Sequence, residues 1–397
     1  MISRKRLREI TFQRQTIEGI CFVLVFGAFF GYLGTHMGLS NMLNTIMNTA
    51  HGLLLNTVFY LMGVVILSGA LSKLLNEFGV VRILQFLFGG LMKPLVRLPG
   101  ISVLGALMSF LSDNPAVLTL AQDSSFSRFF KKYQLISFIN FGTAFGMGLV
   151  VVMFMLGKGF ALEPLVGVVG ATLASCVTTL FMQRYLLHAD PTLDQMMPDP
   201  YARPEERRSH EEKAAQLREH RESIFIRFLN AILDGGKTGV DLGLAIAPGV
   251  IIISTAVFMF TFGKGEGGVY TGEAYQGVEL LPRLAGKIDF VFDWLFGIKS
   301  PELMAFPITS LGAVGAALGQ IPRFMEEGLL DGLDGSNTIA VFTAMGISWS
   351  GFLSTYSAIF DTMGWRKWTS SAMIIHLVCG LLAGVFAHWI FMLVSLI

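Results

Sequence analysis

The chain is organised as long blocks of consecutive apolar residues rather than as amphipathic stripes. An apolar helix needs about 20 residues to cross the hydrocarbon core of a bilayer. The blocks that meet this length are residues 18–38, 54–76, 134–156, 162–187, 240–262, 338–360 and 370–395. This pattern predicts an all-α integral membrane protein with about seven transmembrane helices.

Two further apolar regions, residues 82–121 and 284–320, are interrupted by Pro and Gly near their middles. The first contains Ser112 to Pro115, and the second contains Pro307 within AFPITS. Proline lacks an amide donor and disfavours helix at the residue before it, so each interruption is encoded locally. Irregular backbone at membrane depth survives only where protein or a cavity surrounds it. We therefore predict an interfacial helix followed by a re-entrant hairpin in each region.

Composition supports a membrane protein and excludes several other classes. Of 397 residues, 53% are hydrophobic and 14% are charged, and the net charge of +1 gives no overall field that would attract nucleic acid. The expected partners are therefore the lipid bilayer and not nucleic acid. The three cysteines lie in apolar segments without CxxC spacing, which predicts neither a disulfide framework nor a thiolate metal site. Neither a Walker A loop nor a catalytic signature occurs, so we expect no enzyme, no cofactor and no metal centre.

Positive charge is segregated along the chain and predicts its orientation. Basic residues precede the first helix, follow the first hairpin and precede the last helix: Arg4, Lys5, Arg6, Arg8, Arg14, Arg128, Lys131, Lys132, Arg366 and Lys367. The same side receives the charged segment 188–228. By the positive-inside rule this side is cytoplasmic in a cell (inner) membrane, and seven crossings then put the C-terminus outside.

The charged segment divides the chain into two halves of similar sequence. LNTIMN from Leu43 aligns with LNAILD from Leu229, and Gly100-Ile101 aligns with Gly297-Ile298 at an offset of 197. TAFG from Thr143 aligns with TAMG from Thr343 further along each half. In the predicted topology the matching helices run in opposite directions, so the repeats are inverted, as in many secondary transporters. The expected units are residues 1–42, 43–187, 188–228 and 229–397.

Polar residues at membrane depth are the candidates for chemistry, because each is costly in hydrocarbon unless it is satisfied. They are Ser112, Asp113, Asn114, Asn140, Thr143, Glu302, Thr309, Ser310, Thr343 and Ser348. Half-helix ends at a break can bind anions at their N-termini and cations at their C-termini. The alternative is that these residues only cap and turn the backbone. Asp113 is the leading candidate for contact with a coupling ion or substrate, whereas His376 and His388 flank a GxxxG pair that predicts helix packing.

The order of hairpin, helix and helix in each half carries a family resemblance. GISVLGALMSFLSDNPAVL with FGTAFGMG, and FGIKSPELMAFPITSLGAVGAALG with AVFTAMGISWSGFLST, resemble the nucleoside-recognition Gate domain membrane proteins. That superfamily includes spore-maturation proteins, parts of ferrous iron permeases and concentrative nucleoside transporters. The resemblance covers roughly residues 43–187 and 229–395. It implies one central site between two hairpin tips, although the chain lacks the cluster of Glu and Gln at both tips that would hold a ribose and a base.

These patterns together predict a secondary active transporter, a symporter that moves a small polar, nucleoside-like solute between the hairpin tips. A Na⁺ or H⁺ gradient is the expected driving force. The alternative is a membrane scaffold or accessory protein that keeps the transporter fold and acts through partner proteins. Assembly into a homo-oligomer is compatible with both.

Overall fold

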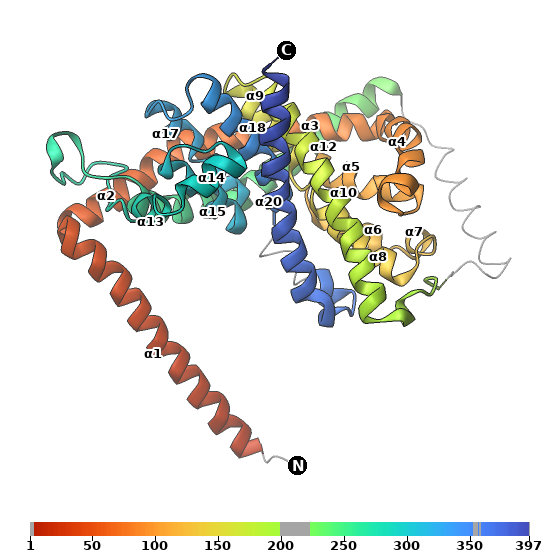
Figure 1. Cartoon of the computed structure of the whole chain (residues 1–397), viewed down its shortest axis with the longest axis horizontal. Helices are drawn as coiled ribbons and strands as arrows, with labels where there is room; N and C mark the ends of the chain where they lie inside the picture. The colour runs from red at the N-terminus through yellow and green to blue at the C-terminus, as the bar shows by residue number, and fades with distance from the viewer. Residues whose placement is uncertain (1–3, 199–222, 352–355, 357–358, 397) are drawn as a thin grey trace.

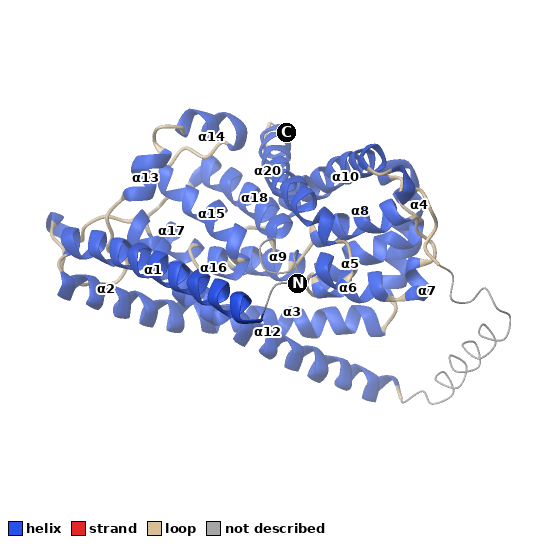
Figure 2. Cartoon of the chain, turned by 90° about the horizontal axis from the view of Figure 1, so that it is seen from below, coloured by secondary structure: helices blue, strands red, loops and turns tan. Residues whose placement is uncertain are grey.

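The computed structural model describes residues 4–198, 223–351, 356 and 359–396, and within these ranges the side chains from residue 15 onward except that of residue 266. These residues form helices joined by loops, and their one β-bridge, Lys131 to Met196, is isolated (Figure 2). Most of the predicted charged segment 188–228 lies outside the described residues. The structure confirms the prediction of an all-α protein.

Six helical runs within the described part of the chain are long and apolar enough to cross a membrane. Three of the runs lie within single helices: Gln15–Met37 in α1 (Arg4–Met37), α10 (Glu163–Ala189) and α12 (Ile224–Thr261). The run Leu39–Glu77 comprises α2 (Leu39–Gly52), a π-helical turn (Leu53–Val58) and α3 (Phe59–Glu77). The run Lys132–Gly157 comprises α8 (Lys132–Thr143) and α9 (Gly148–Gly157), and the run Arg366–Val394 comprises η6 (Arg366–Trp368) and α20 (Thr369–Val394). The protein is therefore a multi-pass membrane protein.

The predicted crossing 338–360 corresponds to α18 (Gly332–Trp349), which is not one of these six runs. Its first turns carry Asp334, Ser336 and Asn337, which lower its hydropathy, and from Asn337 onward every side chain is buried. Because protein rather than lipid surrounds α18, it does not need an apolar outer surface.

Both interrupted regions contain a break, but only the first has its break beside the predicted proline. In the first, α4 (Val80–Val96) is bent by 111° from the run formed by η2 (Gly100–Ser102) and α5 (Val103–Leu111). The chain then breaks at Ser112 to Asn114 before α6 (Pro115–Gln122) and α7 (Ser124–Ser127). In the second, α14 (Asp289–Phe296) precedes η5 (Pro301–Met304), α15 (Ala305–Gly312), α16 (Val314–Leu318) and α17 (Ile321–Glu326). Here Pro307 lies within the first turn of α15, where its missing amide donor costs nothing, and the chain breaks at Ala313 instead. The remaining short elements are η3 (Pro191–Leu193), η4 (Glu266–Gly268) and α13 (Leu280–Ala285).

Each residue of the first hairpin region corresponds to a residue of the second region at a constant difference in residue number, 332 − 132 = 200. α4 and α14 both end in a left-handed residue, Arg97 at φ 54° and Gly297 at φ 65°, and α8 and α18 begin at Lys132 and Gly332. The alignment of Gly100-Ile101 with Gly297-Ile298 is therefore out of register, because Gly297 corresponds to Arg97. The left-handed cap, and not the dipeptide, fixes the register.

Equivalent helices of the two halves pack against each other in opposite directions. Gly69 of α3 contacts Gly235 of α12, whereas Met62, two turns earlier, contacts Gly243, two turns later. Likewise, Tyr185 at the end of α10 hydrogen-bonds Ser371 at the start of α20 through their hydroxyls at 2.8 Å. This antiparallel pairing is what an inverted repeat requires, and Figure 1 shows the two hairpin regions on opposite sides of α10 and α20.

Two exposed ion pairs gather at one end of the helices. Lys131 pairs with Asp194 at 2.7 Å, and Lys367 pairs with Asp190 at 2.8 Å. The first helix, α1, projects away from the other helices (Figure 1). The apolar side chains of α1 are largely exposed, and Val25 has an exposed fraction of 71%.

Candidate functional site

The tip of the first hairpin contacts the chain at the end of α18 and at the break between α8 and α9. The Asn114 side chain is fully buried, and its Nδ2 donates to the carbonyl of Ser350, the C-cap residue of α18. Its Oδ1 has no donor among the described residues. It points at Gly146 in the break between α8 and α9, where a Cβ atom would lie only 2.4 Å from that oxygen. The C-terminal ends of α5, α8 and α18 therefore meet around Asn114.

The two residues before Asn114 face different surroundings. The Asp113 side chain is half-buried, and its Oδ1 accepts a hydrogen bond from the Asn114 amide at 2.7 Å. Ser112 is exposed and faces a cavity. The carboxylate therefore bonds the backbone of the break, which the capping alternative also predicts.

A second buried polar group joins α8 to α20. The Tyr356 hydroxyl donates to Asn140 Oδ1 and lies 3.1 Å from both Thr143 Oγ1 and His376 Nδ1. All four side chains are buried. Sequence reasoning found Asn140 and Thr143 but missed Tyr356 and assigned His376 to helix packing. Tyr356 lies in the other half of the chain from Asn140 and no motif surrounds it, so only the fold brings the two together.

The second hairpin holds its own hydrogen bonds. Thr309 Oγ1 donates to the Ala305 carbonyl at 2.7 Å and accepts from Gln320 Nε2 at 2.6 Å. Ser310 is buried, and its hydroxyl has no partner among the described residues. Ser254 of α12 donates to the Ala316 carbonyl of α16 at 2.9 Å and ties the hairpin to that helix.

Three predicted site residues remain, Glu302, Thr343 and Ser348. Glu302 lines a separate cavity of about 430 Å³ with Glu279, Arg283 and Glu327. Thr343 packs against α10, where a Cβ atom at Gly167 would lie 2.6 Å from the Thr343 Cβ. Ser348 is fully buried near the end of α18, and its hydroxyl has no partner among the described residues.

A cavity of about 290 Å³ lies beside the tip of the first hairpin. It is enclosed by α3 and α12 on one side and by α5 and α9 on the other. Its polar lining residues are Ser68, Ser72, Lys73, Asn76, Ser112 and Thr238. Only Ser112 among these was predicted, because the others lie in α3 and α12, outside the hairpins.

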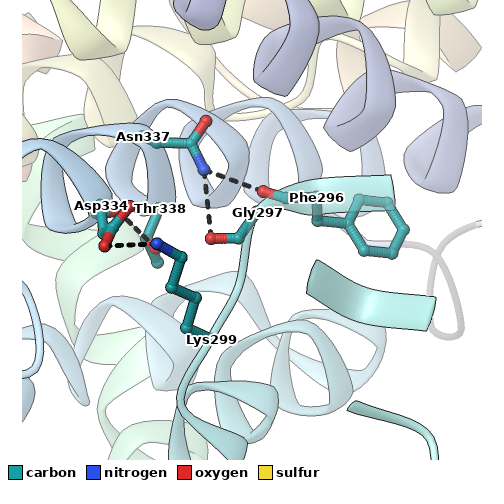
Figure 3. Close-up of polar contacts among 6 residues, drawn as sticks. All are labelled: Phe296, Gly297, Lys299, Asp334, Asn337 and Thr338. Carbon is teal, nitrogen blue, oxygen red and sulfur yellow. Dashed lines mark hydrogen bonds and ion pairs between the residues drawn. The ribbon is translucent and has the colours of Figure 1, made fainter. Parts of the chain in front are cut away.

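A third polar cluster is structural (Figure 3). Asn337 Nδ2 donates to the carbonyls of Phe296 at 2.9 Å and Gly297 at 3.4 Å, and its Oδ1 lies 2.9 Å from His388 Nδ1. Nearby, Lys299 pairs with Asp334 at 2.8 Å. The cluster satisfies carbonyls at the C-terminal end of α14, which have no partner within the helix.

In the first half, two glutamine side chains donate to the equivalent carbonyls at the end of α4. Gln183 Nε2 donates to the Val96 carbonyl at 2.7 Å, and Gln134 Nε2 donates to the Arg97 carbonyl at 2.9 Å. These carbonyls end α4, the counterpart of α14. The paired arrangement explains Asn337 and His388 without a bound ligand.

Comparisons with known proteins agree with this architecture. Residues 58–159, which run from the end of the π-helical turn through α9, match the Gate family model, described as nucleoside recognition. A comparison with curated proteins found no match.

Solved structures of CNTnw are similar over nearly the whole chain. A double variant of CNTnw in an outward-facing state is 13% identical, with 96% of this chain and 86% of that chain covered and a TM-score of 0.54. CNTnw in an inward-facing substrate-bound state is 12% identical, with 99% and 87% covered and a TM-score of 0.53. A single variant in an intermediate state is 11% identical, with 97% and 87% covered and a TM-score of 0.51. The chain is thus a multi-pass membrane protein that matches the Gate nucleoside-recognition model at residues 58–159 and has the overall fold of these CNTnw structures.

Proposed function

We propose that this protein is a secondary active transporter that moves a small polar, nucleoside-like solute across the membrane. The observation that carries the proposal is the polar cavity of about 290 Å³ between the first hairpin tip and the α3–α12 pair. Its volume is close to the lower end of the range of about 300 to 1,000 Å³ for ligand pockets, which suits a small solute. A Gate domain described as nucleoside recognition includes the tip, α3 and α9, three of the elements that line this cavity.

The position of the cavity supports alternating access. One wall is the antiparallel α3–α12 pair, which glycines hold together, and the other wall belongs to the hairpin and α9. Movement of the hairpin unit against the α3–α12 pair would open the cavity to one side of the membrane or to the other. The CNTnw structures with this fold are described as outward-facing, intermediate and inward-facing.

The surroundings of Asn114 support coupling to a cation gradient, Na⁺ or H⁺. Helix C-termini carry partial negative charge and favour cations, and the C-terminal ends of α5, α8 and α18 lie around this side chain, together with the one N-terminus of α6, of which Asn114 is the N-cap residue. The Asn114 Oδ1 atom is a buried acceptor without a donor among the described residues, and the Asp113 carboxylate is its neighbour in the chain. Oxygen ligands of this kind suit hard cations.

The orientation that we infer follows from the charged residues at one end of the helices. Lys131 and Lys367 lie there with their acidic partners, at the end where the first hairpin region joins α8. The positive-inside rule makes this the cytoplasmic side of an inner membrane, with the C-terminus outside. A reporter fused to the C-terminus would be active outside, and activity inside contradicts this orientation.

Uptake into proteoliposomes tests the transporter. Purified protein is reconstituted and offered labelled nucleosides, amino acids and nucleotides with and without an inward Na⁺ or H⁺ gradient. We expect saturable, gradient-driven uptake that Asp113→Ala abolishes while the variant stays folded and inserted. The matched control is Asp331→Ala, which removes an exposed carboxylate outside the cavity. No saturable uptake of any solute would contradict the proposal and favour a scaffold that acts through partner proteins.

A further inference from the structure

The polar residues of α3 form one stripe along the cavity beside the first hairpin tip. Ser68, Ser72 and Asn76 follow each other at every fourth position, so they lie on one helix face, and Lys73 joins them at the cavity wall. Ser68 is buried at 1% exposure, whereas Lys73 and Asn76 are exposed. The cavity therefore extends from a buried hydroxyl to an exposed ammonium group.

Lys73 is the only charged side chain among the described residues that line this cavity, and no carboxylate is among them. The nearest carboxylate on its own helix, Glu77, is engaged by Arg227 of α12 at 2.6 Å. No ion pair to Lys73 occurs within the described ranges. The cavity thus presents one ammonium group and several hydrogen-bond donors to a solute.

Ser68 supplies an independent observation. Its counterpart in the second half, Ser254, donates to the Ala316 carbonyl of the second hairpin at 2.9 Å. The Ser68 hydroxyl has no partner among the described residues, although it is buried and lines the cavity. A buried hydroxyl without a partner costs free energy, and a ligand oxygen in the cavity would satisfy it.

We propose that the solute bound in this cavity carries an oxyanion group, a phosphate or a carboxylate, that Lys73 and the α3 hydroxyls bind. This inference rests on the proposed transporter function and specifies its substrate class. Ammonium and hydroxyl donors bind an anionic oxygen through charge-assisted hydrogen bonds, which are stronger than bonds to a neutral acceptor. The site also agrees with the absence of a Glu cluster at the hairpin tips, because carboxylates there would repel an anion.

Matched pairs of solutes test the proposal. Isothermal titration calorimetry on the purified full chain compares uridine with uridine monophosphate for the phosphate source and uracil with orotate for the carboxylate source. The charged member of at least one pair is expected to bind tenfold or more tightly than its neutral member. Uptake of the same solutes into proteoliposomes is measured in parallel.

Three variants assign the effect to Lys73. Lys73→Gln should weaken binding of the charged solute about tenfold or more and leave the neutral solute unchanged, since one charge-assisted bond is lost. Lys73→Arg keeps the charge and should retain most of the affinity. Lys287→Gln, which removes an exposed charge away from the cavity, is the matched control and should change nothing.

The outcomes separate this inference from the transporter itself. Equal or tighter binding and uptake of the neutral members would overturn the oxyanion site and leave the transporter standing. Unchanged affinity of the charged members in Lys73→Gln, or no binding by any solute of either pair, would also overturn the site. Binding of a charged member that depends on Lys73 but is followed by no saturable uptake would support the site and contradict transport.

Discussion

The crossing of α3 and α12 gives a sharp test of the packing in this protein. In Gly69→Ala, the new Cβ atom would lie 2.4 Å from the Gly235 carbonyl oxygen and 3.3 Å from the Gly239 nitrogen. Contacts between carbon and other heavy atoms are favourable at about 3.5 Å, so the helices must separate by roughly 1 Å. Overpacking of this kind costs about 1 to 3 kcal/mol. A backbone carbonyl cannot rotate away, so we expect a cost near the upper value.

Part of this cost is offset within α3 itself. Alanine is favoured over glycine in a helix interior by about 1 kcal/mol, which leaves a net destabilisation of about 1 to 2 kcal/mol for Gly69→Ala. Gly63→Ala is the matched control in the same helix, because no atom lies within 4 Å of the new Cβ there. This control should leave stability unchanged or raise it by up to about 1 kcal/mol.

Thermal unfolding in detergent, followed by tryptophan fluorescence, measures the difference. The Gly69→Ala protein should melt a few degrees below the Gly63→Ala protein. Equal melting temperatures for the two variants would refute the close contact between α3 and α12, and with it the antiparallel pairing of the two halves that the contact supports.

Two further predictions concern the hairpin tip and the charged end of the helices. Asn114→Ala removes the bond to the Ser350 carbonyl, so gradient-driven uptake should be lost while stability falls by only about 1 to 2 kcal/mol; uptake at the original rate would exclude Asn114 from coupling. Hydrogen bonds from Lys367 and Thr192 lower the pKa of Asp190 to about 2, so this pair stabilises the fold above about pH 4 and its contribution is lost as pH falls through about 2. In Lys367→Gln the Asp190 carboxyl should titrate at a higher pH by NMR, and an unchanged midpoint would contradict the ion pair.

Much of the architecture could be predicted because proline and apolar length act locally. Pro115 is the first residue of α6 and cannot donate an amide hydrogen bond back to Leu111, the last residue of α5, so the hairpin break is visible in the sequence. Apolar length placed the bounds of α18 wrongly, because the first turns of this helix are polar and protein rather than lipid surrounds it. Hydropathy detects contact with lipid and says little about a helix that no lipid touches.

The candidate site could be predicted only where its residues belong to the hairpins. Ser112 and Asn114 could be recognised because they lie beside Pro115 in the sequence. Lys73 and Ser68 lie in a transmembrane helix without a motif, and they line a cavity only because the first hairpin packs against that helix. The partner of Asn114, Ser350, lies in the other half of the chain. Such contacts depend on tertiary structure and leave no mark on local sequence.

The two halves share a backbone and differ in chemistry at the same position. In the register that takes Lys132 to Gly332, Asn114 facing Gly146 corresponds to Val314 facing Gly346, and both side chains are buried against a glycine at the hairpin tip. Valine needs no partner, whereas Asn114 brings an oxygen that no described donor satisfies. Symmetry therefore explains the shape of both hairpins, and the substitution of asparagine for valine explains why the first tip alone presents an unsatisfied amide oxygen at this position. We infer that coupling to a cation depends on this position of the first hairpin and not on its counterpart in the second.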